Sequence, residues 1–149
     1  MKQNNDIKAL GKLDIVVRDK DGYIKDAKTI DNLVVTTGLA YIASRMKDTS
    51  ATAMGYMELG TGTTAAAAGD TAIETVISGS RTALTSTTVT SNAVAYVASF
   101  AAGTGTGAVT EAGILNASSG GTLLCRTVFS AVNKGASDSM TITWTITIS

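Results

Sequence analysis

The sequence predicts a mainly β protein, a β-sandwich or barrel-like fold capped by one α-helix. Several short segments alternate apolar and polar residues with a period of two, which places the apolar side chains on one face of a strand. Pairs of turn-forming residues separate these segments. The 15 glycines and the aromatic content of only 5% suit thin strands and tight turns better than a thick helical core.

The length of 149 residues is most simply that of one domain. Residues 1–12 have no clear period, and we expect them to form an N-terminal arm ahead of a single β-rich domain at residues 13–149. Within this domain Leu13–Arg18 alternates as a strand does. Asp21-Gly22 then indicates a hairpin turn into a second strand at Tyr23–Ile30.

One segment has helical spacing. Its apolar residues recur at intervals of three and four, namely Leu39, Ile42, Ala43 and Met46. Thr36 or Thr37 is available as the N-cap. We therefore predict one helix, at about Thr37–Lys47, that covers one face of a sheet.

The middle of the chain begins with a short strand at Tyr56–Leu59, followed by a Gly- and Ala-rich loop at Gly60–Gly69. Asp70–Ile77 is ambiguous between a short helix and an extended segment. Arg81–Thr90 and Asn92–Phe100 are predicted to be consecutive strands around Ser91-Asn92. The face of the second strand that we expect to be apolar consists of Val94, Tyr96, Ala98 and Phe100.

The C-terminal part is predicted to add three strands. Ala108–Asn116 and Thr122–Phe129 are joined by the loop Ala117–Gly121, whose glycines can adopt the positive φ of a tight reversal. Val132–Ser139 is the turn into the last strand, Thr141–Ser149. This strand separates two faces, one of Ile142, Trp144, Ile146 and Ile148 and the other of Thr141, Thr143, Thr145 and Thr147. One face therefore packs inward, and the other meets water or a partner.

The charge pattern argues against several classes of partner. Twelve basic residues balance twelve acidic ones, so we expect no nucleic-acid partner and no anionic membrane partner. No run approaches the ~20 apolar residues of a membrane helix, and the polar start Met1–Asp6 does not resemble a signal peptide. Basic and acidic residues alternate near the N-terminus, which indicates a solvated surface: Lys2, Lys8, Lys12, Arg18 and Lys20 among Asp6, Asp14, Asp19 and Asp21.

The residues give little support to catalysis. The chain has no histidine, which excludes Ser-His-Asp and Cys-His machinery and histidine zinc sites. Cys125 is the single cysteine, and its place within a strand favours a packed side chain over a nucleophile. Glu111 is interpreted as a solvated or ion-paired carboxylate, with Arg126 as the candidate partner across the hairpin. We predict no catalytic residue and expect the protein not to be an enzyme.

Three loops superficially resemble ligand-binding motifs. Gly60-Thr-Gly62 and Gly103-Thr-Gly-Thr-Gly107 lack both the Gly-Lys-Ser/Thr ending of a P-loop and the glycine spacing of a dinucleotide site. Asp19-Lys-Asp21-Gly22, with Asp26 nearby, lacks the remaining ligands and the flanking helices of an EF-hand. We interpret all three as turns and predict no cofactor and no metal site.

Four segments carry a family resemblance: Asn32-Leu-Val-Val-Thr-Thr-Gly-Leu-Ala-Tyr-Ile-Ala-Ser-Arg45, Tyr56-Met-Glu-Leu-Gly-Thr-Gly-Thr-Thr64, Thr110–Phe129 and Asn133–Trp144. They resemble small virion proteins of tailed bacteriophages, and the likeness extends over roughly Asn32 to Ser149. Their order is also similar to the attachment domain of phage tail-collar fibre proteins. There, a helix follows a short strand, a Leu-Gly-Thr-Gly-like segment comes next, and a Glu-x-Gly-Ile/Leu strand pair precedes the final strand. Collar fibres continue into long receptor-reaching shafts, so a sequence that stops at Ser149 leads us to expect a small stand-alone virion component.

The resemblance implies a non-enzymatic structural component of a phage virion, made in the cytoplasm of the bacterial host. We expect a capsid decoration (cement) protein that binds the major capsid protein or neighbouring virion proteins and assembles with itself as a trimer or dimer. The alternative is a tail or collar/fibre-attachment protein of the same particle. The surfaces expected to meet partners are the Thr-rich face Thr141–Thr147 and the arm Met1–Lys12. A carbohydrate-binding module is a third hypothesis, and it would require exposed aromatic residues.

Overall fold

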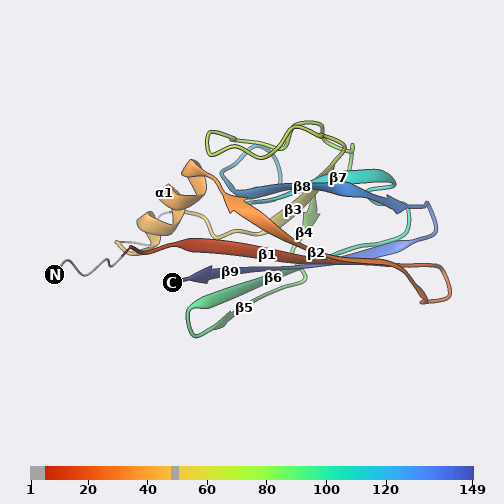
Figure 1. Ribbon diagram of the computed structural model, residues 1–149, viewed down its shortest axis with the longest axis horizontal. Coiled ribbons are helices and arrows are strands. Elements are labelled where there is room, and N and C mark those ends of the chain that lie inside the picture. Colours follow the sequence, from red (N-terminus) through yellow and green to blue (C-terminus); the bar gives the residue numbers. More distant parts are fainter. Residues whose placement is uncertain (1–5, 48–50) are drawn as a thin grey trace.

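The computed structural model describes residues 6–47 and 51–149, which form nine strands and one helix. In chain order the elements are β1 (Ala9–Arg18), β2 (Ile24–Val34), α1 (Thr36–Arg45), β3 (Tyr56–Gly60), β4 (Thr82–Ala83), β5 (Ser86–Thr90), β6 (Ala93–Phe100), β7 (Gly107–Leu115), β8 (Leu123–Lys134) and β9 (Ser139–Ile148). The strands form one antiparallel sheet in the order β4-β3-β7-β8-β2-β1-β9-β6-β5 (Figure 1). The sheet curls into a half-barrel, so the predicted mainly β fold with one helix is confirmed.

The sheet changes direction at β2. This strand pairs with β1 from Ile24 to Asn32 and then with β8 through Leu33 and Val34. One half of the sheet therefore consists of β2, β1, β9, β6 and β5, and the other of β8, β7, β3 and β4. Figure 1 shows the two halves as layers, with β7 and β8 above β1, β9 and β6.

The apolar core lies between these two layers. Trp144 and Phe100 are its largest aromatic side chains, both 0% exposed, and they point inward from β9 and β6 as the alternation predicts. Met57 and Ile114 close the core from the opposite layer. Complete burial of an apolar side chain of this size stabilises the fold by about 1.5–3 kcal/mol.

Helix α1 begins and ends close to the predicted bounds, but its N-cap differs. The N-cap is Val35, and among the described residues no side chain caps the helix. The Thr37 hydroxyl donates instead to the carbonyl oxygen of Leu123 at 2.8 Å, so the predicted threonine cap is wrong because a tertiary hydrogen bond competes for it. Gly38 allows the helix to approach β8, since a Cβ at this position would lie 1.9 Å from the Leu124 carbonyl oxygen.

The N-terminal strand is longer than predicted. β1 begins at Ala9 because it pairs with β9 along its whole length, from Ala9 with Ile148 onward. The expected arm at residues 1–12 is therefore wrong for Ala9–Lys12, which belong to the sheet. Residues 1–5 of the expected arm lie outside the described part of the chain.

Three further boundaries differ from the prediction. The strand expected at Tyr23–Ile30 continues to Val34 as β2, which pairs with β1 and then with β8. The expected strand Arg81–Thr90 is divided into β4 and β5 because the chain crosses from one layer to the other. The Leu84 amide donates to Gly55, whereas the next amide, of Thr85, donates to Val97 in β6. β8 continues to Lys134 through its pairing with β7, which shortens the turn before β9.

Candidate partner-binding surface

The segment between β3 and β4, residues 61–81, covers the outer face of β7. Ile73 is buried, and a Cβ at Gly113 would lie 2.8 Å from its Cγ2 atom, so this side chain packs directly on the backbone of β7. The same segment lines the free edge of β3, where the Thr61 amide donates to Thr75 and the Ile77 amide donates to Leu59. Figure 1 shows it as the yellow-green loop above β7 and β8. Of the two alternatives for Asp70–Ile77, the structure has no helix there, and Val76 forms an isolated antiparallel bridge with Gly60.

A buried carboxylate fastens this segment to the sheet. Glu111 in β7 is 0% exposed and accepts four hydrogen bonds. Its Oε1 accepts from the amides of Gly62 at 2.9 Å and Thr75 at 2.7 Å. Its Oε2 accepts from the amide of Glu74 and from Nε of Arg126, both at 2.9 Å. The predicted pairing of Glu111 with Arg126 is therefore confirmed.

Arg126 extends the connection to the outer part of the loop. This side chain is almost fully buried, and its Nη1 donates to Asp70 at 2.8 Å. Its Nη2 donates to the carbonyl oxygen of Thr64 at 3.0 Å and to Glu74 at 3.3 Å. All three nitrogens of the guanidinium thus donate within the ionic cluster of Asp70, Glu74, Glu111 and Arg126, in which Glu111 and Arg126 are buried and Glu74 is exposed.

The electrostatics of this cluster favour fixed charges. Burial acts to lower the pKa of Arg126, but its hydrogen bonds to Asp70 and Glu111 outweigh that effect and raise it. The pKa of the Asp70 carboxyl is lowered by the Ala67 amide that donates to it and by Arg126 beside it. A general acid or base needs a pKa near the working pH, whereas Asp70 and Arg126 stay ionised at neutral pH. Their charges connect the loop to the sheet.

The glycine-containing loop Gly60-Thr-Gly62 packs directly against the Glu111 carboxylate. A Cβ at Gly60 or Gly62 would lie 2.4 or 2.5 Å from Oε1 of Glu111, so these positions need glycine for close approach. The likeness to a phosphate-cradling loop has a physical basis, because a backbone amide here does bind an anion. The anion is the chain's own carboxylate.

One other ion pair and one buried ammonium group also fix the ends of loops. Arg81 makes a bidentate contact with Glu58, at 3.1 Å from Nε and 2.9 Å from Nη2, and also donates to the carbonyls of Ala117 and Gly120. At the other end of the molecule the ammonium of Lys134 donates to the carbonyl oxygen of Ala101 at 2.9 Å. Burial lowers the pKa of Lys134.

The remaining candidates from the sequence lie in the core, in a hairpin turn or in a loop. Cys125 is fully buried in the core, and burial raises the pKa of its thiol. Asp19 accepts hydrogen bonds from the amides of Asp21 and Tyr23, which closes the predicted β1–β2 hairpin. Gly103, Gly105 and Gly107 all have positive φ. Within residues 6–47 and 51–149, no group of acidic, Cys or His side chains is arranged to hold a metal ion.

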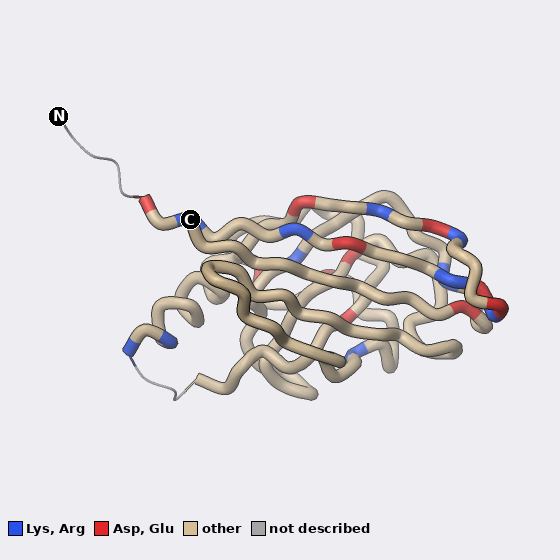
Figure 2. Tube along the Cα trace, turned by 90° about the horizontal axis from the view of Figure 1, so that it is seen from below, with Lys and Arg blue, Asp and Glu red and all other residues tan. Residues whose placement is uncertain are grey.

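The opposite layer of the sheet presents its outer face to solvent. Strand register places the outward side chains of β9, β6 and β5 side by side, for example Thr145 next to Ala95 and Ala95 next to Thr88. None of these residues is charged, and Figure 2 shows the corresponding strands without blue or red segments. We call this surface the neutral face; it consists of Ser86, Thr88, Thr90, Ala93, Ala95, Val97, Ser99, Thr141, Thr143, Thr145 and Thr147.

The neighbouring strands of the same layer are different. β1 and β2 carry alternating charges on their outer faces, with Lys12 opposite Asp31 and Asp14 opposite Thr29. The Thr29 hydroxyl donates to Asp14 at 2.6 Å. Figure 2 shows this contrast as two strands with red and blue segments beside strands that are entirely tan. The neutral face is therefore a bounded patch.

Part of this patch is recognisable in the sequence. The Thr141–Thr147 face was predicted as a contact surface, and it does point outward from β9. The contribution of β5 and β6 was missed, because their place beside β9 depends on long-range pairing. A signal existed: the chain has no charged residue between Arg81 and Glu111, and none after Asp138.

The two edges of the sheet also differ. The edge at β3 is lined by residues 75–77, with an isolated bridge between Gly60 and Val76, and continues into β4, which is only two residues long. The edge at β5 is five residues long, and every one of its residues is exposed. Among the described residues, β5 pairs with β6 alone.

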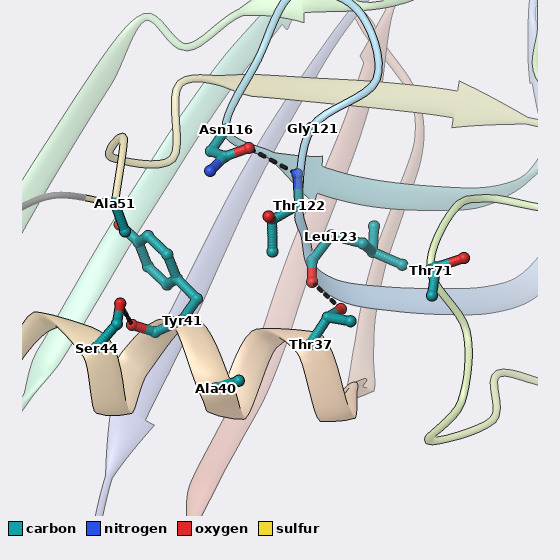
Figure 3. A pocket seen from close by; sticks show the side chains of 10 residues that line it. All are labelled: Thr37, Ala40, Tyr41, Ser44, Ala51, Thr71, Asn116, Gly121, Thr122 and Leu123. Atoms are coloured by element: carbon teal, nitrogen blue, oxygen red, sulfur yellow. Dashed lines mark hydrogen bonds between the residues drawn. The ribbon is translucent and has the colours of Figure 1, made fainter.

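Two hollows lie near α1. A cavity of about 400 Å³ separates the helix from the β7–β8 loop. Figure 3 shows its polar lining, with the Thr37 hydroxyl directed at Leu123 and the Asn116 carbonyl oxygen accepting from the Thr122 amide at 2.7 Å. An apolar groove of about 310 Å³ lies between α1 and the inner side of the β5 edge, and Val89 and Tyr96 contribute to its wall.

The aromatic residues are poorly placed for a carbohydrate platform. Trp144 and Phe100 are fully buried, and Tyr96 is 8% exposed. Tyr23 is 73% exposed, but it lies in the β1–β2 turn and away from the neutral face. Stacking against a sugar ring needs an accessible aromatic face, so the carbohydrate-binding hypothesis has little support from these positions.

Comparison of the chain with protein-family models, with curated proteins and with solved structures finds no match. In the part of the chain that the structure describes, no helix has the length and apolar character needed to cross a membrane.

Proposed function

We propose that this protein is a non-enzymatic structural component of a tailed-phage virion, and that it decorates the capsid by binding the shell lattice through its neutral face. The observation that carries the proposal is the absence of charge from the outer side of three adjacent strands. The likeness of Asn32–Ser149 to small virion proteins supports a phage particle as the assembly.

The desolvation cost of covering the neutral face is low. Solvated surfaces of small domains commonly carry charges on about 25–35% of their residues, and burying an unpaired charge in an interface is costly. The neutral face has small side chains and hydroxyl groups, which lose little side-chain entropy and can form hydrogen bonds when covered. A surface of this composition favours contact with another protein.

The rest of the fold supports a scaffold role. Segment 61–81 covers the opposite layer and is fastened to it through Glu111 and Arg126. A domain whose longest loop is fixed by buried charges can transmit force between neighbours with little local opening. This rigidity suits a protein that stabilises a shell.

The alternative within the same particle is a tail or collar/fibre-attachment protein. The order of the helix, the segment Tyr56–Thr64 and the strand pair in Thr110–Phe129 favours it, because that order is similar to collar-fibre attachment domains. Both roles use a contact surface and differ in copy number. Decoration requires hundreds of copies per particle, and a collar adaptor requires a handful.

Quantitative mass spectrometry of purified particles of the phage that encodes this chain tests the proposal. For a decoration protein we expect a copy number per particle close to that of the major shell protein. A copy number close to that of a tail protein would replace decoration by the collar role. Absence from the particles would overturn the virion assignment altogether.

A binding experiment tests the surface. Particles that lack the protein are mixed with purified protein and sedimented. Thr143→Lys places a charge in the middle of the neutral face and should abolish co-sedimentation. Ala27→Lys, the matched control, places the same charge on the already charged outer face of β2 and should leave binding intact. Equal binding by both variants would exclude the neutral face as the contact.

A further inference from the structure

We propose that β5 is a pairing edge, through which two copies of this chain join their sheets about a two-fold axis. The occupant of the edge is the β5 strand of a second copy, in antiparallel orientation. This inference goes beyond the proposed function, because it concerns assembly of the free protein.

The first observation is that the edge is unprotected. Natural edge strands are kept from pairing by charge, proline, bulges, short length or covering segments. β5 has the sequence Ser-Thr-Thr-Val-Thr, in which four of five residues are β-branched and none is charged or proline. The opposite edge is short and lined by the chain itself, as described above.

The second observation is the backbone. In an antiparallel ladder, alternate residues of an edge strand direct their N–H and C=O groups away from their neighbour. β5 is fully exposed, so these groups form an open template along the strand. A second β5 in antiparallel orientation satisfies them symmetrically, because each strand supplies the same pattern.

The absence of charge at this edge allows a second copy of the chain to be the occupant. Around a two-fold axis each group approaches its own image, so any charge near the axis would meet a like charge. β5 and its neighbour β6 have no charged residue, and the two copies can therefore approach at the axis without this repulsion. Pairing would also make one continuous neutral face from two, with six uncharged strands in a row.

The apolar side of the edge contributes to the fit. Val89 is 70% exposed on β5, and its side chain lines the apolar groove of about 310 Å³ next to α1. Pairing centred on Thr88 would bring Val89 of each copy to the seam, where it would be covered. The strand is roughly 17 Å long, so we expect a dimer that dissociates on dilution.

Sedimentation-velocity analysis of the purified protein over a range of concentrations tests the proposal. We expect a monomer–dimer equilibrium for the wild type and a dimerisation constant weakened at least about tenfold by Thr88→Lys. Thr145→Lys, on β9 and away from the edge, is the matched control and should dimerise like the wild type. A strict monomer, a trimer, or a dimer that resists Thr88→Lys but is lost in Thr145→Lys would overturn the proposal.

Cross-linking gives a second measurement that does not depend on affinity. The native thiol, Cys125, is buried, so a new surface cysteine reports alone. Thr88→Cys lies at the expected axis and should form an intermolecular disulfide under mild oxidation, whereas Thr145→Cys should not. Equal cross-linking of both variants would contradict edge pairing. Neither assay involves phage particles, so its failure is distinguishable from failure of the virion proposal.

Discussion

Nε of Arg126 donates to Oε2 of Glu111 at 2.9 Å, and both side chains lie beneath a loop on the outer face of the sheet. The two residues belong to neighbouring strands and are offset by two positions along the ladder, since Glu111 is opposite Val128 and Arg126 is opposite Gly113. Glu111 holds the inner part of segment 61–81 through backbone amides, and Arg126 holds the outer part through Asp70. The pair is therefore the connection between the sheet and its longest loop.

Replacing Arg126 should destabilise the protein strongly. Arg126→Met removes the guanidinium but keeps much of the apolar volume, and it leaves the buried Glu111 carboxylate without its positive partner. Breaking a buried pair in this way costs about 3–5 kcal/mol. Chemical denaturation measured by circular dichroism should show this loss, with Lys12→Ala, an exposed residue, changing stability by less than about 0.5 kcal/mol.

The double variant distinguishes a coupled pair from two independent contacts. Glu111→Gln alone should also be destabilising, because an amide nitrogen then faces the donors that surround the site. If the two side chains act as a unit, Glu111→Gln with Arg126→Met should cost much less than the sum of the single changes. Additive losses would mean that the two side chains hold the loop independently of one another.

Acid should weaken the same connection. The pKa of Asp70 is lowered in the folded protein by the Ala67 amide and by Arg126, so its carboxylate stabilises the fold above the unfolded-state pKa. This contribution is lost as the pH falls through the lowered folded value, below about 4. Asp70→Asn should therefore be less stable than the wild type at neutral pH and lose that difference in acid. A stability difference independent of pH would exclude the carboxylate as its cause.

The local order of the sequence predicted most of the sheet. Alternation identifies the inward face of β9, because the apolar residue Trp144 lies between the polar residues Thr143 and Thr145 in the sequence. Asp21-Gly22 and Gly120-Gly121 fix two hairpins by backbone conformation, which depends on few neighbours. These features are local, so they can be derived without knowing the tertiary structure.

The features that were missed depend on distant partners. Lys12 lies in β1 because Thr145 pairs with it, although its own surroundings have no strand period. Thr37 fails to cap α1 because Leu123 offers its carbonyl oxygen. The neutral face could be recognised only in part from the sequence. Thr88 and Thr145 lie on the same surface because both pair with Ala95 of β6, one from each side.

Gly38 offers a test of how closely the helix approaches the sheet. Gly38→Ala would place a Cβ 1.9 Å from the backbone oxygen of Leu124, and a backbone atom cannot move aside without disturbing β8. The intrinsic preference of a helix for alanine over glycine, about 1 kcal/mol, acts in the opposite direction. We expect the steric effect to dominate, with a net loss of about 1–3 kcal/mol in thermal or chemical unfolding.

Gly69→Ala is a control for this prediction. Gly69 is exposed, and nothing lies within 4 Å of a Cβ built there. Its substitution should change the free energy of unfolding by less than about 0.5 kcal/mol. A stabilising effect of Gly38→Ala would show that α1 can shift away from β8.

The β5–β6 turn contains a position where the protein can be made more stable. Ser91 has a φ of +53°, a left-handed conformation that is unfavourable for a residue with a Cβ. Ser91→Gly removes this strain. It also increases the entropy of the unfolded chain, which reduces the gain in stability by about 0.4–1 kcal/mol. We expect a net gain of about 0.5 kcal/mol in unfolding free energy. Ser91→Ala, which also removes the hydroxyl but keeps the Cβ, should give no gain. A gain of equal size in both variants would attribute the effect to the lost hydroxyl and contradict backbone strain at the turn that leads into the β5 edge.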